Sequence, residues 1–236
     1  DNNGTFVVEN PENYSGLYLP LASEKGLKSS ITPTLAGDSK TDQNHFLFEP
    51  VSIENLHNNK NGRNFWCRIN NKDIWSVSGV SAMQEAEKFS NAQDESKIEA
   101  GFMWQKLTRV SKKFGIRSEV LSFVPADENI EIMYVTLENI SDNDIDITPV
   151  AALPIYGRSA DNIRDHRHVT SLLHRIVTKD YGIEVSPVLS FDERGHRKND
   201  TTYFVYGSKE DAGKPKEFYP TNQMFIGEGG SFLIPE

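Results

Sequence analysis

The sequence predicts an all-β protein: a large antiparallel sandwich with little helix. Two observations support this. Runs rich in β-branched and aromatic residues recur along the chain, and residues typical of turns separate them. The length of 236 residues is enough for a sizeable core, and no linker or repeat divides the chain, so residues 1–236 are expected to form a single domain.

The clearest strands form two predicted hairpins. Residues 116–124 and 130–138 flank the sequence Pro-Ala-Asp-Glu-Asn at 125–129, which is typical of a turn. The second of these strands carries apolar residues on both faces, which predicts a position between two layers. Asn70 and Asn71 predict another hairpin turn, between strands at 65–69 and 74–77.

The remaining strands and the helix are predicted from less distinct sequence patterns. Residues 143–148 alternate between polar and apolar side chains, as in a half-buried strand. Further strands are expected at 5–9, 45–53, 99–110, 169–178, 183–189, 201–207 and 222–226. Residues 82–89 form the one helical pattern, but they are few and no capping residue is recognised before them, so a loop is the alternative.

Composition excludes some classes of protein. The formal net charge of −9 argues against nucleic acid as a partner, because phosphate binding needs a basic surface. No apolar run has the length of a membrane span, and no signal peptide is recognised. Cys67 is the single cysteine, so no disulfide forms within the chain, and its apolar neighbours predict a buried thiol. A reducing, cytoplasmic location is expected, and the absence of a starting methionine suggests a piece of a longer protein.

The most unusual segment is 156–175, which holds four arginines, three histidines and two aspartates. Three interpretations are open. His166 and His168 would share a face of a strand and could ligate a metal, but the arginines between them oppose a divalent cation. The histidines and arginines could instead form a polar network with Asp161 and Asp165, or they could contact a ligand or a partner.

Other motifs favour structural roles. The nucleophile pattern Gly-x-Ser-x-Gly is absent. Residues 227–230, Gly-Glu-Gly-Gly, lack the lysine of a phosphate loop and predict a tight turn after a strand. Trp66, Trp75 and Trp104 could stack on sugars, but tryptophan in a sandwich strand is more often part of the core.

Several motifs occur in an order that resembles a known family. Residues 99–109 (EAGFMWQKLTR) precede 114–125 (FGIRSEVLSFVP) and 135–142 (VTLENISD), and residues 64–67, 75–79 and 225–235 fit the same pattern. This order resembles the N-terminal domain of glycoside hydrolase family 94. These are the cellobiose-phosphorylase-like enzymes, formerly glycosyltransferase family 36. The resemblance covers nearly the whole chain.

The resemblance implies a fold and a reaction. The fold would be the β-supersandwich of galactose-mutarotase-like domains. The catalytic aspartate of the family lies in an (α/α)6 barrel that follows this domain, so no catalytic residue is expected here. In the family reaction, inorganic phosphate cleaves a terminal β-glucosyl unit with inversion and releases α-glucose 1-phosphate. Phosphate would be a co-substrate, and neither a metal nor an organic cofactor is implied.

The resemblance also implies partners and a site. Family members are commonly homodimers, and a segment written Asp-x-x-Asn-Phe-Gln-Arg reaches toward the sugar site of the partner subunit. Here Asn162 matches, whereas Arg164 and Asp165 replace Gln-Arg, which disfavours cellobiose and suggests the branch that acts on 1,2-β-oligoglucans. The substrate-binding residues expected from this match and from the charge density are Arg158, Asn162, Arg164, Asp165, His166 and Arg167. The expected partners are therefore a β-glucan oligosaccharide, the barrel of the same enzyme and a second subunit.

Two residues at the end of the charged segment and two alternative functions lie outside this match. His174 and Arg175 are assigned to an ordinary strand without a functional role. One alternative function is a stand-alone carbohydrate-binding module. The other is an aldose epimerase of the same fold, which needs a converging histidine and glutamate whose spacing is not recognised here.

Overall fold

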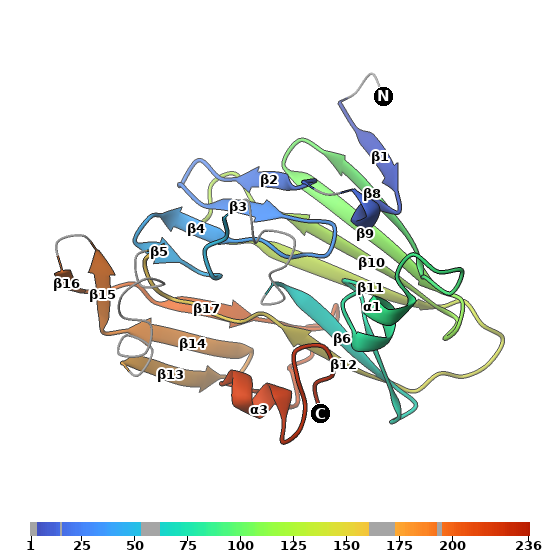
Figure 1. The fold of residues 1–236 in the computed structure, drawn as a ribbon. Helices are drawn as coiled ribbons and strands as arrows, with labels where there is room; N and C mark the ends of the chain where they lie inside the picture. Colours follow the sequence, from blue (N-terminus) through green and yellow to red (C-terminus); the bar gives the residue numbers. More distant parts are fainter. Residues whose placement is uncertain (1–3, 15, 53–61, 161–172, 193–194) are drawn as a thin grey trace.

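A computed structural model describes residues 4–14, 16–52, 62–160, 173–192 and 195–236, and strands dominate it (Figure 1). The strands are β1 (Phe6–Glu9), β2 (Leu19–Ala22), β3 (Lys28–Ile31), β4 (Ser39–Asp42), β5 (His45–Phe46), β6 (Asn64–Ile69), β7 (Asp73–Ser76), β8 (Glu95–Gly101), β9 (Trp104–Ser111), β10 (Ile116–Phe123), β11 (Ile132–Asn139), β12 (Ile147–Ala152), β13 (His174–Lys179), β14 (Gly182–Pro187), β15 (Leu189–Asp192), β16 (Gly195–Lys198) and β17 (Tyr203–Tyr206). The helical elements of the described residues are η1 (Pro11–Asn13), α1 (Ala82–Glu87) and α3 (Asn222–Ile226). The predicted all-β class is confirmed.

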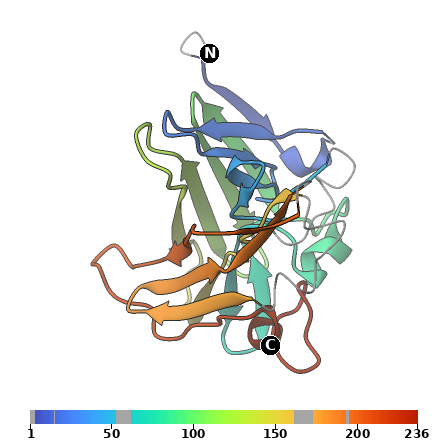
Figure 2. The same ribbon diagram turned by 90° about the vertical axis from the view of Figure 1, so that its left-hand side faces the viewer.

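The strands form antiparallel sheets. The largest has the order β1-β8-β9-β10-β11, and a four-stranded sheet has the order β2-β3-β4-β5. Two three-stranded sheets, β12-β6-β7 and β13-β14-β17, and the hairpin β15-β16 complete the set. In both views the β13-β14-β17 sheet lies at the opposite end of the molecule from β1 (Figures 1 and 2).

Three sheets share one hydrophobic core. Leu107 and Val120 come from the five-stranded sheet, Leu21 and Ile31 from the four-stranded sheet, and Trp75 from the β12-β6-β7 sheet. All five are at most 1% exposed. Burying each of these side chains contributes about 1.5 to 3 kcal/mol to folding, so this junction holds the sheets together.

The hairpin of β10 and β11 confirms the predicted strands and turn, with Ile116 paired to Asn139 and Phe123 to Ile132. The prediction that the second strand lies between two layers was wrong. Met133 packs against the core, whereas Tyr134 on the other face is 48% exposed. Only one face of β11 covers the core, and its other face is open to solvent in the described part of the chain.

Local turn chemistry explains where prediction succeeded and failed along the strands. Asn70 and Asn71 have φ values of 50° and 55°, as the predicted hairpin turn requires. Residues 99–110 were predicted as one strand, but the chain turns at Met103, with φ of 59°, and forms β8 and β9. The strand predicted at 143–148 begins only at Ile147, and β2, β3 and β4 were not predicted.

A side-chain cap precedes each of the described α-helices, α1 and α3, and neither cap was predicted. Ser81 caps α1 in a capping box: its side chain accepts a hydrogen bond from Gln84 N, and the Gln84 side chain accepts one from Ser81 N. The predicted helix therefore exists and is capped. Residues 222–226 were predicted as a strand but form α3, because Thr221 accepts a hydrogen bond from Met224 N at 3.2 Å. The predicted glycine turn consequently follows a helix rather than a strand.

The buried aromatic and thiol side chains follow the prediction. Trp66, Trp75 and Cys67 lie in the core, whereas Trp104 is only half-buried, with its ring beside Gly101. Burial raises the pKa of the Cys67 thiol to about 12, so this group is protonated and inert at neutral pH.

Two kinds of feature are absent from the described residues. No described helix is long and apolar enough to cross a membrane. Nor do His, Cys, Asp and Glu side chains gather in this part of the chain in groups of three or more that could hold a metal ion.

Candidate functional site

Arg158 is the one predicted site residue that the structure describes, and its backbone is fixed beside β5. Phe46 N donates to Arg158 O at 3.0 Å, and Gly157 N donates to Phe46 O at 3.0 Å. The guanidinium lies 4.3 Å from the centroid of the Tyr156 ring, and its Nε donates to Tyr156 O at 3.3 Å. Tyr156 is itself buried and donates from its hydroxyl to Ser159 O at 3.2 Å. The start of the charged segment is therefore held against the sandwich.

The other predicted site residues, Asn162, Arg164, Asp165, His166 and Arg167, lie outside the described residues. So do Asp161 and His168, which entered the metal and network interpretations. The described chain approaches this segment at Ala160, whose N donates to Gln43 O at 3.0 Å.

His174 lies next to Arg158 at the beginning of β13. A Cβ placed on Gly157 would be 3.7 Å from His174 Cε1, so the ring packs against the backbone that precedes Arg158. Burial, and then the positive charge of Arg158, lower the pKa of His174 to about 4. The imidazole is therefore neutral at pH 7. From the sequence, Arg158 was assigned to the site and His174 to an ordinary strand. In the structure the two residues are neighbours, because β13 starts beside the turn at Gly157.

Tyr203 and Asn199 complete a polar cluster with Arg158 and His174, named here the Arg158 cluster. The same Gly157 position would place a Cβ 3.5 Å from Tyr203 Cδ2. Tyr203 and Asn199 are each only 7% exposed. Burial, followed by the nearby Asp42 carboxylate, raises the pKa of the Tyr203 hydroxyl, which is a neutral donor at physiological pH.

Three buried polar atoms of this cluster have no hydrogen-bond partner among the described residues: His174 Nε2, Asn199 Nδ2 and Tyr203 Oη. The Asn199 amide lies beside the Tyr203 hydroxyl, where it lowers the hydroxyl pKa, but the two groups lack hydrogen-bond geometry. Buried polar atoms are nearly always paired in folded proteins, because each one left unpaired costs about 1 to 3 kcal/mol. Three such atoms around the turn at Gly157, without partners among the described residues, therefore indicate a place for a polar ligand or ordered water.

The cluster is suited to binding rather than to bond cleavage. The amide nitrogen, the phenol and the guanidinium donate hydrogen bonds, and the neutral imidazole can donate or accept. It contains no serine or cysteine nucleophile and no pair of carboxylates. Sequence reasoning selected Arg158 as a candidate through its charged neighbours and did not select Tyr203 or Asn199. They come from segments with an ordinary strand and turn pattern, and only the fold brings them to Arg158.

The comparison with known families gives a specific match. The family model of the glycosyl hydrolase 94 supersandwich domain matches residues 23–236. The chain belongs to this family. The predicted resemblance and the supersandwich fold are thus confirmed, and the match indicates a non-catalytic domain of family 94 enzymes. No curated protein matches the chain.

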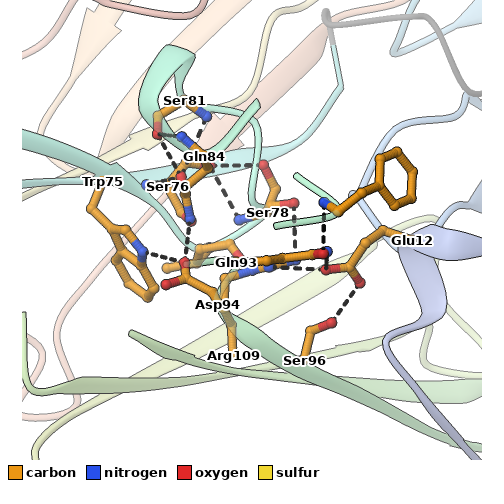
Figure 3. A network of polar contacts seen from close by, with 12 residues as sticks. Glu12, Trp75, Ser76, Ser78, Ser81, Gln84, Gln93, Asp94, Ser96 and Arg109 are labelled. Carbon is orange, nitrogen blue, oxygen red and sulfur yellow. Dashed lines mark hydrogen bonds and ion pairs between the residues drawn. The ribbon is translucent and has the colours of Figure 1, made fainter. Parts of the chain in front are cut away.

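In this supersandwich domain a second polar network lies between η1, α1 and β9 (Figure 3). Arg109 Nη1 contacts Glu12 Oε1 at 3.2 Å, and its other nitrogens donate to Val77 O and Ser78 O. Burial raises the pKa of Glu12, but Arg109 and the Ser96 hydroxyl outweigh it, so the pKa is lowered and Glu12 is ionised. The ion pair is thus supported by further hydrogen bonds on both partners.

The same network joins α1 to the core (Figure 3). Gln84 Nε2 donates to Asp94 Oδ2 at 2.8 Å and to Ser76 O at 3.0 Å, and Trp75 Nε1 donates to the same Asp94 oxygen at 2.8 Å. A small pocket opens between these side chains, but their polar groups already have protein partners. This network in the supersandwich domain is therefore structural, in contrast to the Arg158 cluster.

Proposed function

We propose that this chain is the N-terminal domain of a glycoside phosphorylase that cleaves β-glucosidic bonds with inorganic phosphate and inverts the anomeric centre. The supersandwich domain would be structural, would form the dimer contact, and would lend side chains to the acceptor-sugar site of a partner subunit. Arg158 and the residues expected after it, Asn162, Arg164, Asp165, His166 and Arg167, would make these contacts.

One observation carries this proposal. In a family 94 domain, the Arg158 guanidinium lies in the same cluster as buried polar atoms that have no hydrogen-bond partner among the described residues. Arg158 contacts the Tyr156 ring, and His174, Asn199 and Tyr203, near the same turn, present three atoms that have no partner among the described residues. A sugar offers vicinal hydroxyls, which both donate and accept, and a guanidinium fork suits two of them at once. A polyol such as a sugar is therefore a ligand class that this set of donors and acceptors can bind.

The reaction is tested with the full-length enzyme. β-1,2-, β-1,3- and β-1,4-linked gluco-oligosaccharides are incubated with and without inorganic phosphate, and the product is followed by NMR. The expected result is phosphate-dependent release of α-glucose 1-phosphate from at least one linkage. Release of free glucose at the same rate without phosphate would reject a phosphorylase.

The site is tested in the synthetic direction, where the acceptor Michaelis constant is measured. Arg158→Ala and Arg158→Lys are expected to raise this constant about tenfold with a smaller change in kcat, because the fork contacts bound sugar rather than the reacting atoms. Arg175→Ala, an exposed position at the start of the same strand as His174, is the matched control. An acceptor Michaelis constant that is unchanged in both Arg158 variants would reject the site.

The dimer contact is tested separately by sedimentation of the full-length enzyme. A concentration-independent dimer is expected. A monomer across the micromolar range would reject the proposed contact with a partner subunit, whatever the assay of the reaction shows.

A further inference from the structure

The β13-β14-β17 sheet has two faces of different character. His174, Val185 and Tyr203 share the face that lies toward the Arg158 cluster, and Val185 and Tyr203 are buried. The alternate positions point the other way, since successive residues of a strand point to opposite faces. The sheet therefore has an outer face, turned away from the Arg158 cluster.

Apolar and aromatic side chains are exposed on the outer face. Register places Val177 opposite Glu184 and Glu184 opposite Phe204, so the three strands present these side chains in one row. Val177 is 48% exposed, Phe204 40% and Tyr206 48%. Such exposed aromatic side chains on a sheet, rimmed by charges, are typical of a recognition surface.

The two rings are fixed relative to each other and to the strands. The centroids of Phe204 and Tyr206 are 5.0 Å apart, with an angle of 42° between the ring planes. Tyr206 is paired with Gly182, and a Cβ on Gly182 would lie 2.6 Å from Tyr206 Cδ1. The Tyr206 ring therefore packs directly on the glycine of the neighbouring strand, which only a residue without a side chain permits.

Hydrogen-bonding groups border the rings in a fixed arrangement. The Tyr206 hydroxyl donates to Glu184 Oε1, and Lys179 Nζ lies 3.5 Å from Glu184 Oε2. The bond from Tyr206, assisted by Lys179, lowers the pKa of Glu184, so the carboxylate is ionised. A carboxylate and an ammonium group of opposite charge thus stand beside two aromatic faces.

We propose that this outer face, formed by Phe204, Tyr206, Glu184 and Lys179 and named here the Tyr206 platform, binds a β-linked gluco-oligosaccharide away from the Arg158 cluster. A pyranose ring has a flat face of C–H groups, which an aromatic ring covers, and a rim of hydroxyls, which a carboxylate and an ammonium group bind. The opposite charges of Glu184 and Lys179 favour an uncharged ligand over an anion.

The size of the platform also favours a sugar over a protein. A stable protein interface needs about 800 Å² on each partner and a largely uncharged centre. Here a charged pair lies directly beside the two rings, and the apolar row on the described strands extends beyond them only to Val177. One or two sugar units match this area. The platform would hold one part of a glucan chain on the domain while another part of the same chain is processed. This proposal rests on the proposed function only for the choice of β-glucans.

The test is binding of β-1,2-, β-1,3- and β-1,4-linked glucopentaose to the full-length protein, followed by calorimetry and by changes in Tyr and Phe NMR signals. We expect a dissociation constant in the millimolar range or tighter for at least one linkage. Phe204→Ala and Tyr206→Ala are expected to weaken it about tenfold. Tyr206→Phe, which keeps the ring and removes the bond to Glu184, should give a smaller loss. Phe102→Ala, at an exposed aromatic residue in the turn between β8 and β9, should bind like the wild type.

The outcomes separate this proposal from the proposed function. Arg158→Ala should leave binding at the platform unchanged, and Phe204→Ala should leave the acceptor Michaelis constant for a disaccharide-sized acceptor unchanged. Equal affinity in the wild type and in a Phe204→Ala/Tyr206→Ala double variant with an unaltered melting temperature would overturn the platform. So would a change of oligomeric state in that variant, which would identify the face as a subunit contact. Failure of phosphorolysis with intact platform binding would count only against the phosphorylase.

Discussion

Glu12 and Arg109 form a buried ion pair although 97 positions separate them along the chain. Their side chains are 5% and 3% exposed, and Glu12 also accepts from the Ser96 hydroxyl at 2.5 Å. The contact joins η1, which precedes the family-matched region, to the central strand β9 within it. The N-terminal segment is therefore part of the folded unit.

Replacing Glu12 by Gln should destabilise the protein strongly. The substitution keeps the shape of the side chain but leaves the buried Arg109 guanidinium without its counter-charge. Loss of one partner of a buried pair costs about 3 to 5 kcal/mol. The free energy of unfolding, measured by urea denaturation at pH 7, provides the test.

A surface pair supplies the matched control for Glu12→Gln. Lys112 and Glu95 form an ion pair whose side chains are well exposed. Glu95→Gln should change the free energy of unfolding by less than about 1 kcal/mol, because solvent screens the pair. Equal effects of the two substitutions would show that the Glu12 pair does not hold the N-terminal segment in place.

His174 should make the protein less stable as the pH falls below 6.5. Its pKa is about 4 in the folded state and 6.5 as an unperturbed group. Between these values the unfolded chain binds a proton that the folded chain does not, so stability decreases with decreasing pH. His174→Gln removes this titration. The free energy of unfolding of the wild type and of His174→Gln is measured from pH 7 to pH 4.5. Relative to the variant, the wild type should lose stability steadily as the pH falls. A pH-independent difference would contradict the burial of the imidazole.

Arg158 should account for part of the low His174 pKa. In Arg158→Leu the positive charge is removed but the burial stays, so the pKa should rise above 4 and remain below 6.5. NMR titration of the His174 ring measures this directly. Arg175→Leu, which changes a positive charge at an exposed neighbouring position, should leave the titration nearly unchanged. A His174 pKa that is the same in Arg158→Leu and in the wild type would show that the Arg158 charge does not act on the His174 ring.

Local chemistry made much of the sheet predictable. The hairpin of β10 and β11 and the turn at Asn70 and Asn71 were found because their signals lie in adjacent residues. The strand break at Met103 was missed because a non-glycine residue adopts positive φ there, without a turn motif to announce it. The order of the family motifs identified the domain where strand prediction alone could not.

The candidate site was less predictable than the fold. Arg158 was found through the charge density of its segment. Tyr203 and Asn199 lie about 40 residues further along the chain, and only the packing brings together their buried atoms, which have no partner among the described residues. Likewise, Phe204 and Tyr206 occupy a plain strand pattern, and their exposure follows from which face of the β13-β14-β17 sheet is covered.

Cys67 should resist thiol reagents in the folded protein. Its side chain is buried in β6, and its pKa of about 12 leaves almost no thiolate at pH 8. Labelling with an aromatic disulfide reagent should be slow in buffer and complete within minutes in concentrated urea. Fast labelling in buffer would mean that the β12-β6-β7 sheet opens readily.

Removing the cap of α1 should cost a measurable but moderate amount of stability. The Ser81 hydroxyl accepts from Gln84 N at 3.3 Å and donates to Gln84 Oε1 at 2.7 Å, and both residues are buried. Ser81→Ala should lower the free energy of unfolding by about 1 to 2 kcal/mol, because a donor at the helix start loses its acceptor. Ser81→Thr, which keeps the hydroxyl, should recover part of this loss in the same urea titration. Ser90→Ala in the exposed turn after α1 is the control, with an expected effect below about 0.5 kcal/mol. If Ser81→Ala had no larger effect than Ser90→Ala, the capping box would not be what fixes α1 against Trp75 and Asp94.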